Sequence, residues 1–386
     1  MTDTLDIDDL LQNDKVRTIV CCGSGGVGKT TTSAAIAVRA AEQGRRVAVL
    51  TIDPAKRLAQ AIGLEHLDNE PERVPTVDES AGGSLDAMML DMKRTFDEVV
   101  VRHAAPEKVQ QILDNPFYQA VSSSFAGTQE YMAMERLGQL MGETDESGKP
   151  RWDLVVVDTP PSRSALDFLD APQRLGTFLD GKFIRLMTAP ARAGGRAYLK
   201  VVSVGISSVS AVMSKVLGAQ LLSDAQTFIA ALETMFGGFR ERADQTYALL
   251  KDPSTRFVVV ATPDRDALRE AAYFVDRLEE DGMPLAGMVV NRVQMTYVPS
   301  VNASRARNAA DAVGELLDRT SGWRPKDTEA LLRLHAEVTD LGVRHAEAIE
   351  RFRVLHPKVS IAQVAAAGHD VNDISELRDV AEQLTA

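Results

Sequence analysis

Short apolar runs, rich in β-branched residues, recur along the chain and predict the strands of a sheet. Residues 16–22 form the first run, and the glycines after it indicate a buried parallel strand that enters a tight turn. Residues 46–52 form the second, which ends where Asp53-Pro54 stops strand pairing and starts a loop. Further strands are predicted at residues 84–90, 154–158, 257–261, 288–291 and 359–364.

Helical spacing of apolar residues fills most of the sequence between these strands. Residues 30–43 place alanine and valine at that spacing, and Gly44 is positioned to end the helix. A second helical tract is predicted at residues 327–355. Strands that alternate with helices predict an α/β fold, a doubly wound and mostly parallel sheet with ligands at the carboxyl ends of its strands.

The same pattern predicts how the chain is divided. We expect one α/β domain over residues 15–386, with helical insertions at about 92–145 and 165–250, where the only strand signal is a doubtful one at 199–204. Residues 1–14 are acidic and have no charged start followed by an apolar run, so they are not a secretory signal. A frayed polar leader is expected there.

Charge and cysteine content narrow the class of protein. The formal net charge is -12 and the pI is near 5.1, which argues against a broad basic face for nucleic acid or anionic lipid. No run of about 18 apolar residues is present. Cys21 and Cys22 are neighbours in a predicted strand and point to opposite faces, which suits neither a disulfide nor a metal site. We expect a soluble cytoplasmic protein with no nucleic-acid partner.

The strongest chemical signal is the loop after the first predicted strand. Its spacing, G-x-x-x-x-G-K-[ST], allows successive backbone amides to surround an anion, and the next helix adds its positive N-terminal end. Lys29 is expected to reach the β and γ phosphates, and the Thr30 hydroxyl to bind magnesium. We therefore predict that ATP with Mg²⁺ binds to the loop formed by Gly23, Ser24, Gly25, Gly26, Val27, Gly28, Lys29, Thr30 and Thr31.

Two aspartates lie at the ends of predicted strands, where an open parallel sheet directs side chains towards a bound phosphate. Either Asp53 or Asp158 could bind magnesium or orient the attacking water. A strand-end aspartate can also cap a turn or a helix. The presence of a phosphate loop in the same chain favours the functional interpretation of both.

Together these motifs resemble a known family. The loop Gly-x-Gly-Gly-Val-Gly-Lys-Thr-Thr, followed by Asp53-Pro54-Ala55 and Asp158-Thr159-Pro160-Pro161-Ser162, is similar to the ArsA-like arsenical-pump and tail-anchored-protein targeting ATPases. Those are phosphate-loop NTPases with a deviant Walker A motif, in a dimeric group that also includes septum-site and plasmid-partition proteins. The resemblance covers nearly the whole chain. Thr262-Pro263, a helix and then Val290-Asn291-Arg292 match the place where that family recognises adenine.

The resemblance implies roles for individual residues. Lys29 and Thr30 would serve phosphate and magnesium, and Asp53 would polarise the attacking water, so Asp53 and Lys29 are the expected catalytic pair. Thr30, Asp53 and Asp158 would form the magnesium site. Asn291 would hydrogen-bond adenine, since an amide can donate and accept on one base edge. An asparagine after a strand can also simply form a turn.

The chain departs from the family pattern at the loop. Ser24 stands where the family usually has a second lysine that crosses the dimer to the partner's nucleotide. Loss of such a charge can lower turnover by a factor of about 10³. Arg163 could replace it, or could be an ordinary solvated arginine. We therefore expect a nucleotide-driven dimeric ATPase, either a homodimer or one half of a heterodimer with a related chain, with a membrane-protein client or membrane partner as candidates.

Two other functions fit the same residues. One is a non-hydrolysing, ATP-bound chaperone or regulatory scaffold for apolar segments. The other is a partition or positioning ATPase, against which the acidic balance and the lack of a basic or amphipathic terminal helix argue. Flexible methionine side chains could line a groove for apolar segments, although a methionine in a helix is more often core; the candidates are Met132, Met134, Met141, Met187, Met213 and Met235.

Overall fold

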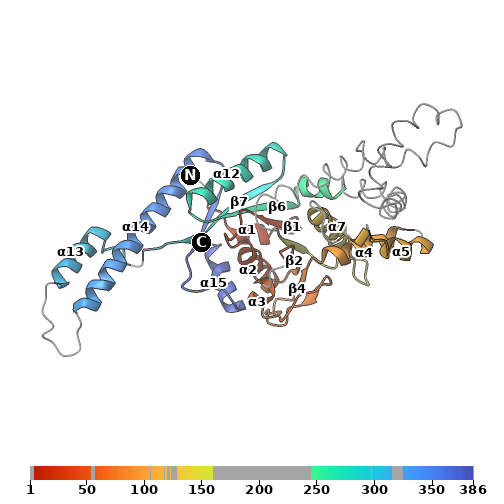
Figure 1. Cartoon of the computed structure of the whole chain (residues 1–386), viewed down its shortest axis with the longest axis horizontal. Coiled ribbons are helices and arrows are strands. Elements are labelled where there is room, and N and C mark those ends of the chain that lie inside the picture. The colour runs from red at the N-terminus through yellow and green to blue at the C-terminus, as the bar shows by residue number, and fades with distance from the viewer. Residues whose placement is uncertain are drawn as a thin grey trace, which may run out of the picture.

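One eight-stranded sheet lies at the centre of the molecule (Figure 1). The computed structural model describes residues 4–53, 57–104, 106–116, 118–119, 122, 128–159, 245–296, 298–314 and 325–385. The strands are β1 (Thr18–Cys22), β2 (Arg46–Thr51), β3 (Glu72–Arg73), β4 (Ser84–Met89), β5 (Leu154–Asp158), β6 (Thr255–Ala261), β7 (Leu285–Val293) and β8 (Ile361–Ala365). The helices of the described ranges are α1 (Ile7–Leu11), α2 (Lys29–Glu42), α3 (Arg57–Ala61), α4 (Met92–His103), α5 (Pro106–Leu113), α7 (Thr128–Gly142), α12 (Arg265–Glu280), α13 (Ala303–Gly314), α14 (Pro325–Leu355) and α15 (Ile374–Gln383).

The strand order is β3-β4-β2-β5-β1-β6-β7-β8. Every pairing is parallel except that of β3 with β4. This confirms the predicted α/β fold with a doubly wound, mostly parallel sheet. The edge strand β3 was not predicted, because a strand of two residues is too short to show a periodic pattern.

The strand that precedes the phosphate loop lies inside the sheet, between β5 and β6. Both β1 and β5 are buried along their whole length, which explains why each is a continuous apolar run rather than an alternating one. Cys21 and Cys22 are buried in β1, as small core residues. Because β5 separates β1 from β2, the loops that follow these three strands meet at one edge of the sheet.

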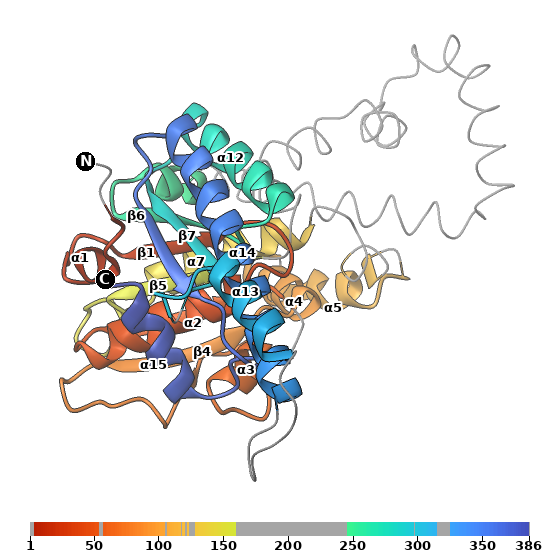
Figure 2. The ribbon, with the colours of Figure 1, turned by 90° about the vertical axis from the view of Figure 1, so that its left-hand side faces the viewer.

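Helices cover both faces of the sheet (Figure 2). One apolar cluster joins α2, α3 and α15 to one face, with Ile36 of α2 at its centre. The other joins α4, α7, α12 and the end of α14 to the opposite face, with Phe96 of α4 as a member. Neighbouring strand residues divide between the clusters, since Ile19 belongs to the first and Val20 to the second. The core therefore consists of two layers with the sheet between them.

The N-terminal segment is folded, and the expectation of a frayed polar leader over residues 1–14 is wrong from residue 4 onwards. Ile7 and Leu11 of α1 are buried in the same cluster as α2. The Asp8 carboxylate accepts two hydrogen bonds from the Arg39 guanidinium on α2, each of 2.6 Å. This helix was not predicted, because five residues are too few to display an amphipathic period.

The structure describes most of the first region expected as a helical insertion and little of the second. Within residues 92–145 the structure has α4, α5 and α7, and Met132 and Met134 of α7 are buried in the core. These two methionines are therefore core residues and do not line a surface groove. Residues 160–244 lie outside the described residues, and with them Arg163, the doubtful strand and the three methionines of that stretch.

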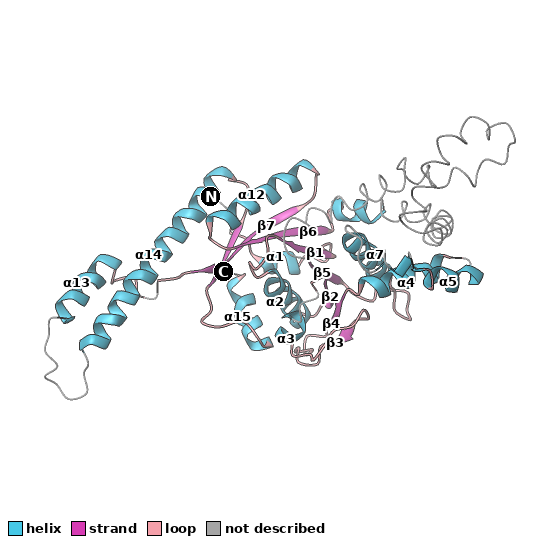
Figure 3. Cartoon of the chain, in the orientation of Figure 1, coloured by secondary structure: helices cyan, strands magenta, loops and turns pink. Residues whose placement is uncertain are grey.

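A hairpin of α13 and α14 projects from the sheet on the side away from α4 and α5 (Figures 1 and 3). The two helices pack through small residues, with Ala306 and Ala336 buried between them. Further along α14, Ile349 and Phe352 join the core of the domain. No helix in the described ranges, including α14 with its 31 residues, combines the length and the apolar content needed to cross a bilayer.

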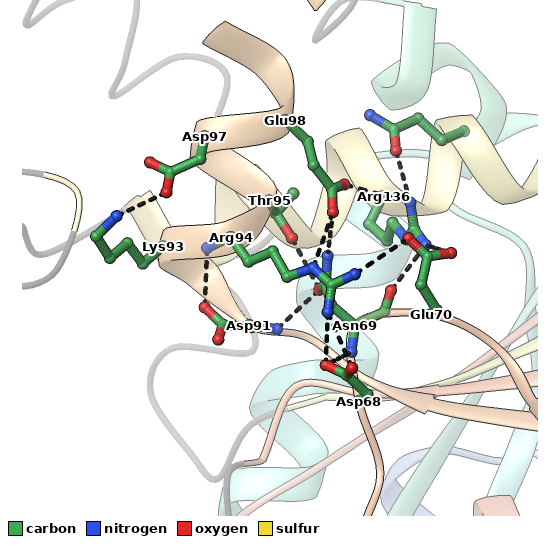
Figure 4. Close-up of polar contacts among 11 residues, drawn as sticks. Asp68, Asn69, Glu70, Asp91, Lys93, Arg94, Thr95, Asp97, Glu98 and Arg136 are labelled. Carbon is green, nitrogen blue, oxygen red and sulfur yellow. Dashed lines mark hydrogen bonds and ion pairs between the residues drawn. The ribbon is translucent and has the colours of Figure 1, made fainter. Parts of the chain in front are cut away.

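A buried polar cluster fastens α4 and α7 to the segment between α3 and β3 (Figure 4). Asn69 is fully buried, and its side-chain oxygen accepts hydrogen bonds from the Asp91 amide at 2.9 Å and from the Thr95 hydroxyl at 3.0 Å. The side-chain amide of Asn69 donates a hydrogen bond to the Glu98 carboxylate at 3.2 Å, and the main-chain oxygen of Asn69 accepts one from Arg136 of α7 at 2.8 Å. The Asn69 side chain thus connects the segment between α3 and β3 to the start of α4.

Candidate functional site

The loop between β1 and α2 has a backbone that glycine favours. Gly23, Gly26 and Gly28 adopt φ of +146°, +77° and +96°, in the region that other residues avoid. A Cβ on Gly23 would lie 2.1 Å from the Val260 carbonyl oxygen, and one on Gly28 would lie 2.1 Å from the side-chain nitrogen of Asn291. These contacts bring the loop against β6 and β7 and leave its amides free to face a ligand.

Lys29, the first residue of α2, is buried within this loop. Its ammonium donates a hydrogen bond of 2.8 Å to the main-chain oxygen of Ser24. Burial lowers the pKa of Lys29, and the nearby Asp158 carboxylate acts in the opposite direction. A cation held by one neutral carbonyl can exchange that contact for a phosphate oxygen with little loss.

Asp158 ends β5 and is completely buried. Its Oδ2 accepts hydrogen bonds from the hydroxyls of Thr30 and Thr51, each of 2.8 Å. Its Oδ1 has no partner among the described residues. Burial raises the pKa of Asp158 to about 6, although the two threonine hydrogen bonds and Lys29 favour the charged form. An unpaired oxygen on a buried carboxylate is costly unless a cation or donor reaches it.

These groups fit a magnesium ion. Magnesium is usually held by one or two protein oxygens together with phosphates and waters. The Thr30 hydroxyl and the free Oδ1 of Asp158 offer such oxygens at the start of α2. In the parts of the chain that the structure describes, no cluster of three or more His, Cys, Asp or Glu side chains is present, so a cage built from protein side chains alone is not found there. When bound, the ion would supply charge neutralisation at the phosphates.

Asp53 follows β2 at the same edge of the sheet. Its amide donates to the Thr51 hydroxyl at 3.2 Å, so Thr51 links the Asp53 backbone to the Asp158 carboxylate. On the other side, the hydroxyl of Thr159 donates to the Cys21 main-chain oxygen at 2.8 Å and ties the end of β5 to the loop. The two aspartates predicted from their strand-end positions therefore come together with the loop.

A cavity of about 640 Å³ is lined by Lys29, Thr30 and Asp53, whereas the fully buried Asp158 is not part of its lining. The cavity extends from α3 to the segment that follows β8. Several of its lining residues were not singled out from the sequence, because nothing local distinguishes them. The predicted residues on its wall are Gly26, Gly28, Lys29, Thr30, Thr31 and Asp53, and the additional ones are Arg57, Gln60, Ala61, Thr159, Arg292, Asp370, Val371 and Asn372.

A second hollow of about 660 Å³ lies on the outer side of the loop. Ser24, Gly25 and Val27 contribute to this hollow and not to the first. Gly23 lines neither, because it is packed against β6. The predicted loop residues are therefore divided between two surfaces. The remaining walls come from the start of α12 and from α14, and include Asp264, Asp266, Glu270, Leu341 and His345.

The Asn291 side chain is hydrogen-bonded to the phosphate loop. Its side-chain nitrogen donates to the Val27 main-chain oxygen at 2.9 Å, and its side-chain oxygen accepts from the Arg292 amide at 2.8 Å. The amide therefore braces the loop, and a direct contact with adenine would require these bonds to be exchanged. The adenine assignment stays a prediction.

Arg292, next in β7, is the better placed of the two residues for a ligand. It has φ of +58°, at a point where the pairing of β7 with β8 shifts register. Such a backbone costs a non-glycine residue on the order of 1 kcal/mol and is found where a side chain is redirected at a functional site. Arg292 lines both the cavity and the second hollow.

Comparison with known proteins agrees with this architecture. A profile of the anion-transporting ATPase family matches residues 16–313, which is most of the chain. The chain belongs to this family. The match includes the loop, both strand-end aspartates and β7, so the resemblance drawn from the motifs is confirmed at the level of the family.

Individual relatives of this family member are distant. ATPase ASNA1 homolog 1 of Paramecium tetraurelia is 24% identical over 288 residues, which cover 74% of this chain and 77% of that protein. ATPase ARSA2 of Chlamydomonas reinhardtii is 25% identical over 383 residues, covering 96% and 93%. The arsenical pump-driving ATPase of Escherichia coli is 26% identical over 322 residues, covering 83% of this chain and 44% of that protein. The chain thus spans less than half the length of that pump-driving relative.

Proposed function

We propose that this member of the anion-transporting ATPase family binds ATP with magnesium in the cavity beside the phosphate loop, hydrolyses it, and acts as a nucleotide-driven switch. The observation that carries the proposal is the arrangement around Asp158. Its carboxylate receives hydrogen bonds from Thr30 and Thr51 and keeps one buried oxygen without a described partner. A magnesium ion held by Thr30 and Asp158 would give this oxygen a partner and would neutralise phosphate charge.

In this proposal each charged group has a separate task. Lys29 leaves the Ser24 carbonyl and binds the phosphate chain, and Thr30 and Asp158 hold magnesium. Asp53 lines the same cavity and orients the attacking water, as the catalytic partner of Lys29, with a further contact to the magnesium shell. The family resemblance supports these roles, and the cavity supports those of Lys29, Thr30 and Asp53, because all three line it.

A second chain is part of the proposal. The loop has one cation, Lys29, because the position where the family usually has another lysine is Ser24. The pump-driving relative of Escherichia coli extends over more than twice the length matched here. We therefore propose a homodimer, or a heterodimer in which a related chain supplies the missing charge. We also propose that the dimer works in the cytoplasm on a membrane-protein client or a membrane partner.

One observation favours a second candidate, an ATP-bound chaperone or regulatory scaffold without useful turnover. Ser24 is neutral and buried, so it cannot supply charge to a neighbouring nucleotide. Binding and turnover are therefore separate questions for this chain. An experiment that measures both distinguishes the two candidates.

Calorimetric titration of the purified full chain with ATP and ADP, in Mg²⁺ and in EDTA, tests the proposal. We expect micromolar or tighter binding that requires Lys29, so Lys29→Ala should abolish it while Lys358→Ala, which removes an exposed lysine far from the loop, should not. Phosphate release should fall in Asp53→Asn with binding retained. Binding with no phosphate release would favour the scaffold, and no binding in either condition would refute both candidates.

A further inference from the structure

The cavity beside the loop has two chemically different ends. The loop from β1 lies between them, since β2 and β5 are on one side of β1 and β6, β7 and β8 are on the other. Of the residues that line the cavity, Asp53, Arg57 and Thr159 follow β2 and β5 and define its first end, and Val371 and Asn372 follow β8 and define its second end. A nucleotide whose phosphates rest on the loop must place its base at one end and its terminal phosphate at the other.

The residues that would hold magnesium indicate which end of the cavity accommodates the terminal phosphate. A magnesium ion bound with a nucleoside triphosphate would neutralise charge on its outer phosphates. The oxygens suited to it belong to Thr30 and to Asp158 at the end of β5, and Thr51 of β2 is bonded to the same carboxylate. These groups lie on the side of the first end. The terminal phosphate therefore faces α3, and the base faces the segment after β8.

Arg57 is the cationic side chain at that first end among the described residues. It begins α3, and Gln60 and Ala61, which lie one turn further, also line the cavity. Leu58, Ala59 and Ala61 are buried in the apolar core, whereas Arg57 and Gln60 are exposed. The packing of this short helix therefore directs the face that carries Arg57 towards the cavity.

The Arg57 guanidinium also has no competing partner. It makes no hydrogen bond or ion pair with any residue of the described ranges. By contrast, Arg39, Arg46 and Arg94 each pair with carboxylates. A free guanidinium beside an anion site can form a bidentate contact with a phosphate, which a lysine cannot do in the same way.

We infer that Arg57 binds the terminal phosphate of the nucleotide and supplies, within one chain, the positive charge that Ser24 does not provide. The inference rests on the proposed function and adds a residue to it. The guanidinium transfers no proton; it donates hydrogen bonds to the phosphate oxygens, whose negative charge it offsets as the bond to the leaving ADP breaks and the bond to water forms. Its contact is specific to a triphosphate, because ADP has no phosphate at that end.

The test compares ATP with ADP in Arg57→Ala, with Arg102→Ala as a matched control that removes an exposed arginine from α4. Affinities are measured by calorimetry in Mg²⁺ with ADP and with a non-hydrolysable ATP analogue. We expect Arg57→Ala to weaken the analogue about tenfold or more and ADP less than about twofold, and to lower phosphate release about 100-fold if the wild-type chain releases phosphate. Arg57→Lys should retain part of the preference for triphosphate.

The outcomes separate this inference from the function on which it rests. If the wild-type chain binds neither nucleotide, the proposed function fails and the inference fails with it. If the wild-type chain binds both nucleotides and Arg57→Ala leaves the ratio of the two affinities unchanged, the inference alone is overturned. An equal loss for ATP and ADP would also overturn it, since that result indicates a structural role for Arg57.

Discussion

Replacing Asp158 by asparagine is expected to stabilise the nucleotide-free protein while abolishing its response to magnesium and ATP. Asp158 is wholly buried, and its pKa is raised from 3.8 to about 6 by burial. The folded protein thus holds this proton more tightly than the unfolded chain does. The free energy of unfolding therefore falls as the pH rises from about 4 to 6, and the loss is complete above that range.

The size of the effect follows from the shift. A change of about two pKa units corresponds to about 3 kcal/mol at pH 7.5. About half of that loss is present at pH 5, where the carboxyl is mostly protonated in the folded state. Asparagine is neutral at both pH values, and its oxygen can still accept hydrogen bonds from Thr30 and Thr51. For a chain of 386 residues, 3 kcal/mol corresponds to a rise of about 4 °C in Tm.

Thermal unfolding in EDTA at pH 7.5 and at pH 5 measures the effect. Asp158→Asn should melt above the wild type at pH 7.5, by a margin that narrows at pH 5. Asp153→Asn is the matched control with the opposite sign, because its hydrogen bond with Arg46 lowers the pKa of Asp153, so its loss should lower Tm at pH 7.5. A variant no more stable than wild type at pH 7.5, or a margin equal at both pH values, would refute the reasoning.

Magnesium and ATP reverse the order of the two proteins. At a ligand concentration 1,000 times its Kd, binding adds about 4.1 kcal/mol to the stability of the protein that binds it, which exceeds the advantage of about 3 kcal/mol expected for Asp158→Asn without ligand. We expect this gain in the wild type and not in Asp158→Asn, which lacks the carboxylate charge. The same variant should therefore be the more stable protein without ligand and should lose that advantage with it. This exchange of stability for binding is expected where a charge is buried for function.

Two further changes test the loop and the polar cluster. Gly28→Ala should weaken ATP binding at least tenfold, because the added Cβ would lie 2.1 Å from the Asn291 side chain and the residue has φ of +96°. Gly148 has a similar φ of +78° but open space around it, so Gly148→Ala should only lower Tm slightly. Equal ATP affinities of the two variants in calorimetry would contradict this. Asn69→Ala should lower the free energy of unfolding in urea by about 2 to 3 kcal/mol, because it leaves buried donors unpaired. Replacing the exposed Asn13 by alanine should lower it by less than about 0.5 kcal/mol. Similar losses in the two variants would show that the cluster is not stabilising.

Local pattern was sufficient for the sheet and for the phosphate loop. Strand runs such as β1 and β5 are buried on both faces, so their apolar character is continuous and can be read without knowledge of their neighbours. The phosphate loop could also be predicted from local sequence, because its own backbone conformation requires its glycines. Elements without a local signal were missed, as with α1, whose burial depends on contacts with α2 and α15 far along the chain.

The site itself was decided by strand order. Asp53 and Asp158 could be proposed from the sequence, but Thr51 as the link between them, Arg57 as a cation without a partner among the described residues, and Arg292 at the bulge could not. Their positions depend on β5 pairing between β1 and β2 and on β7 pairing with β8. Such pairings join segments that are distant in sequence, and short-range periodicity carries no information about which strands become neighbours.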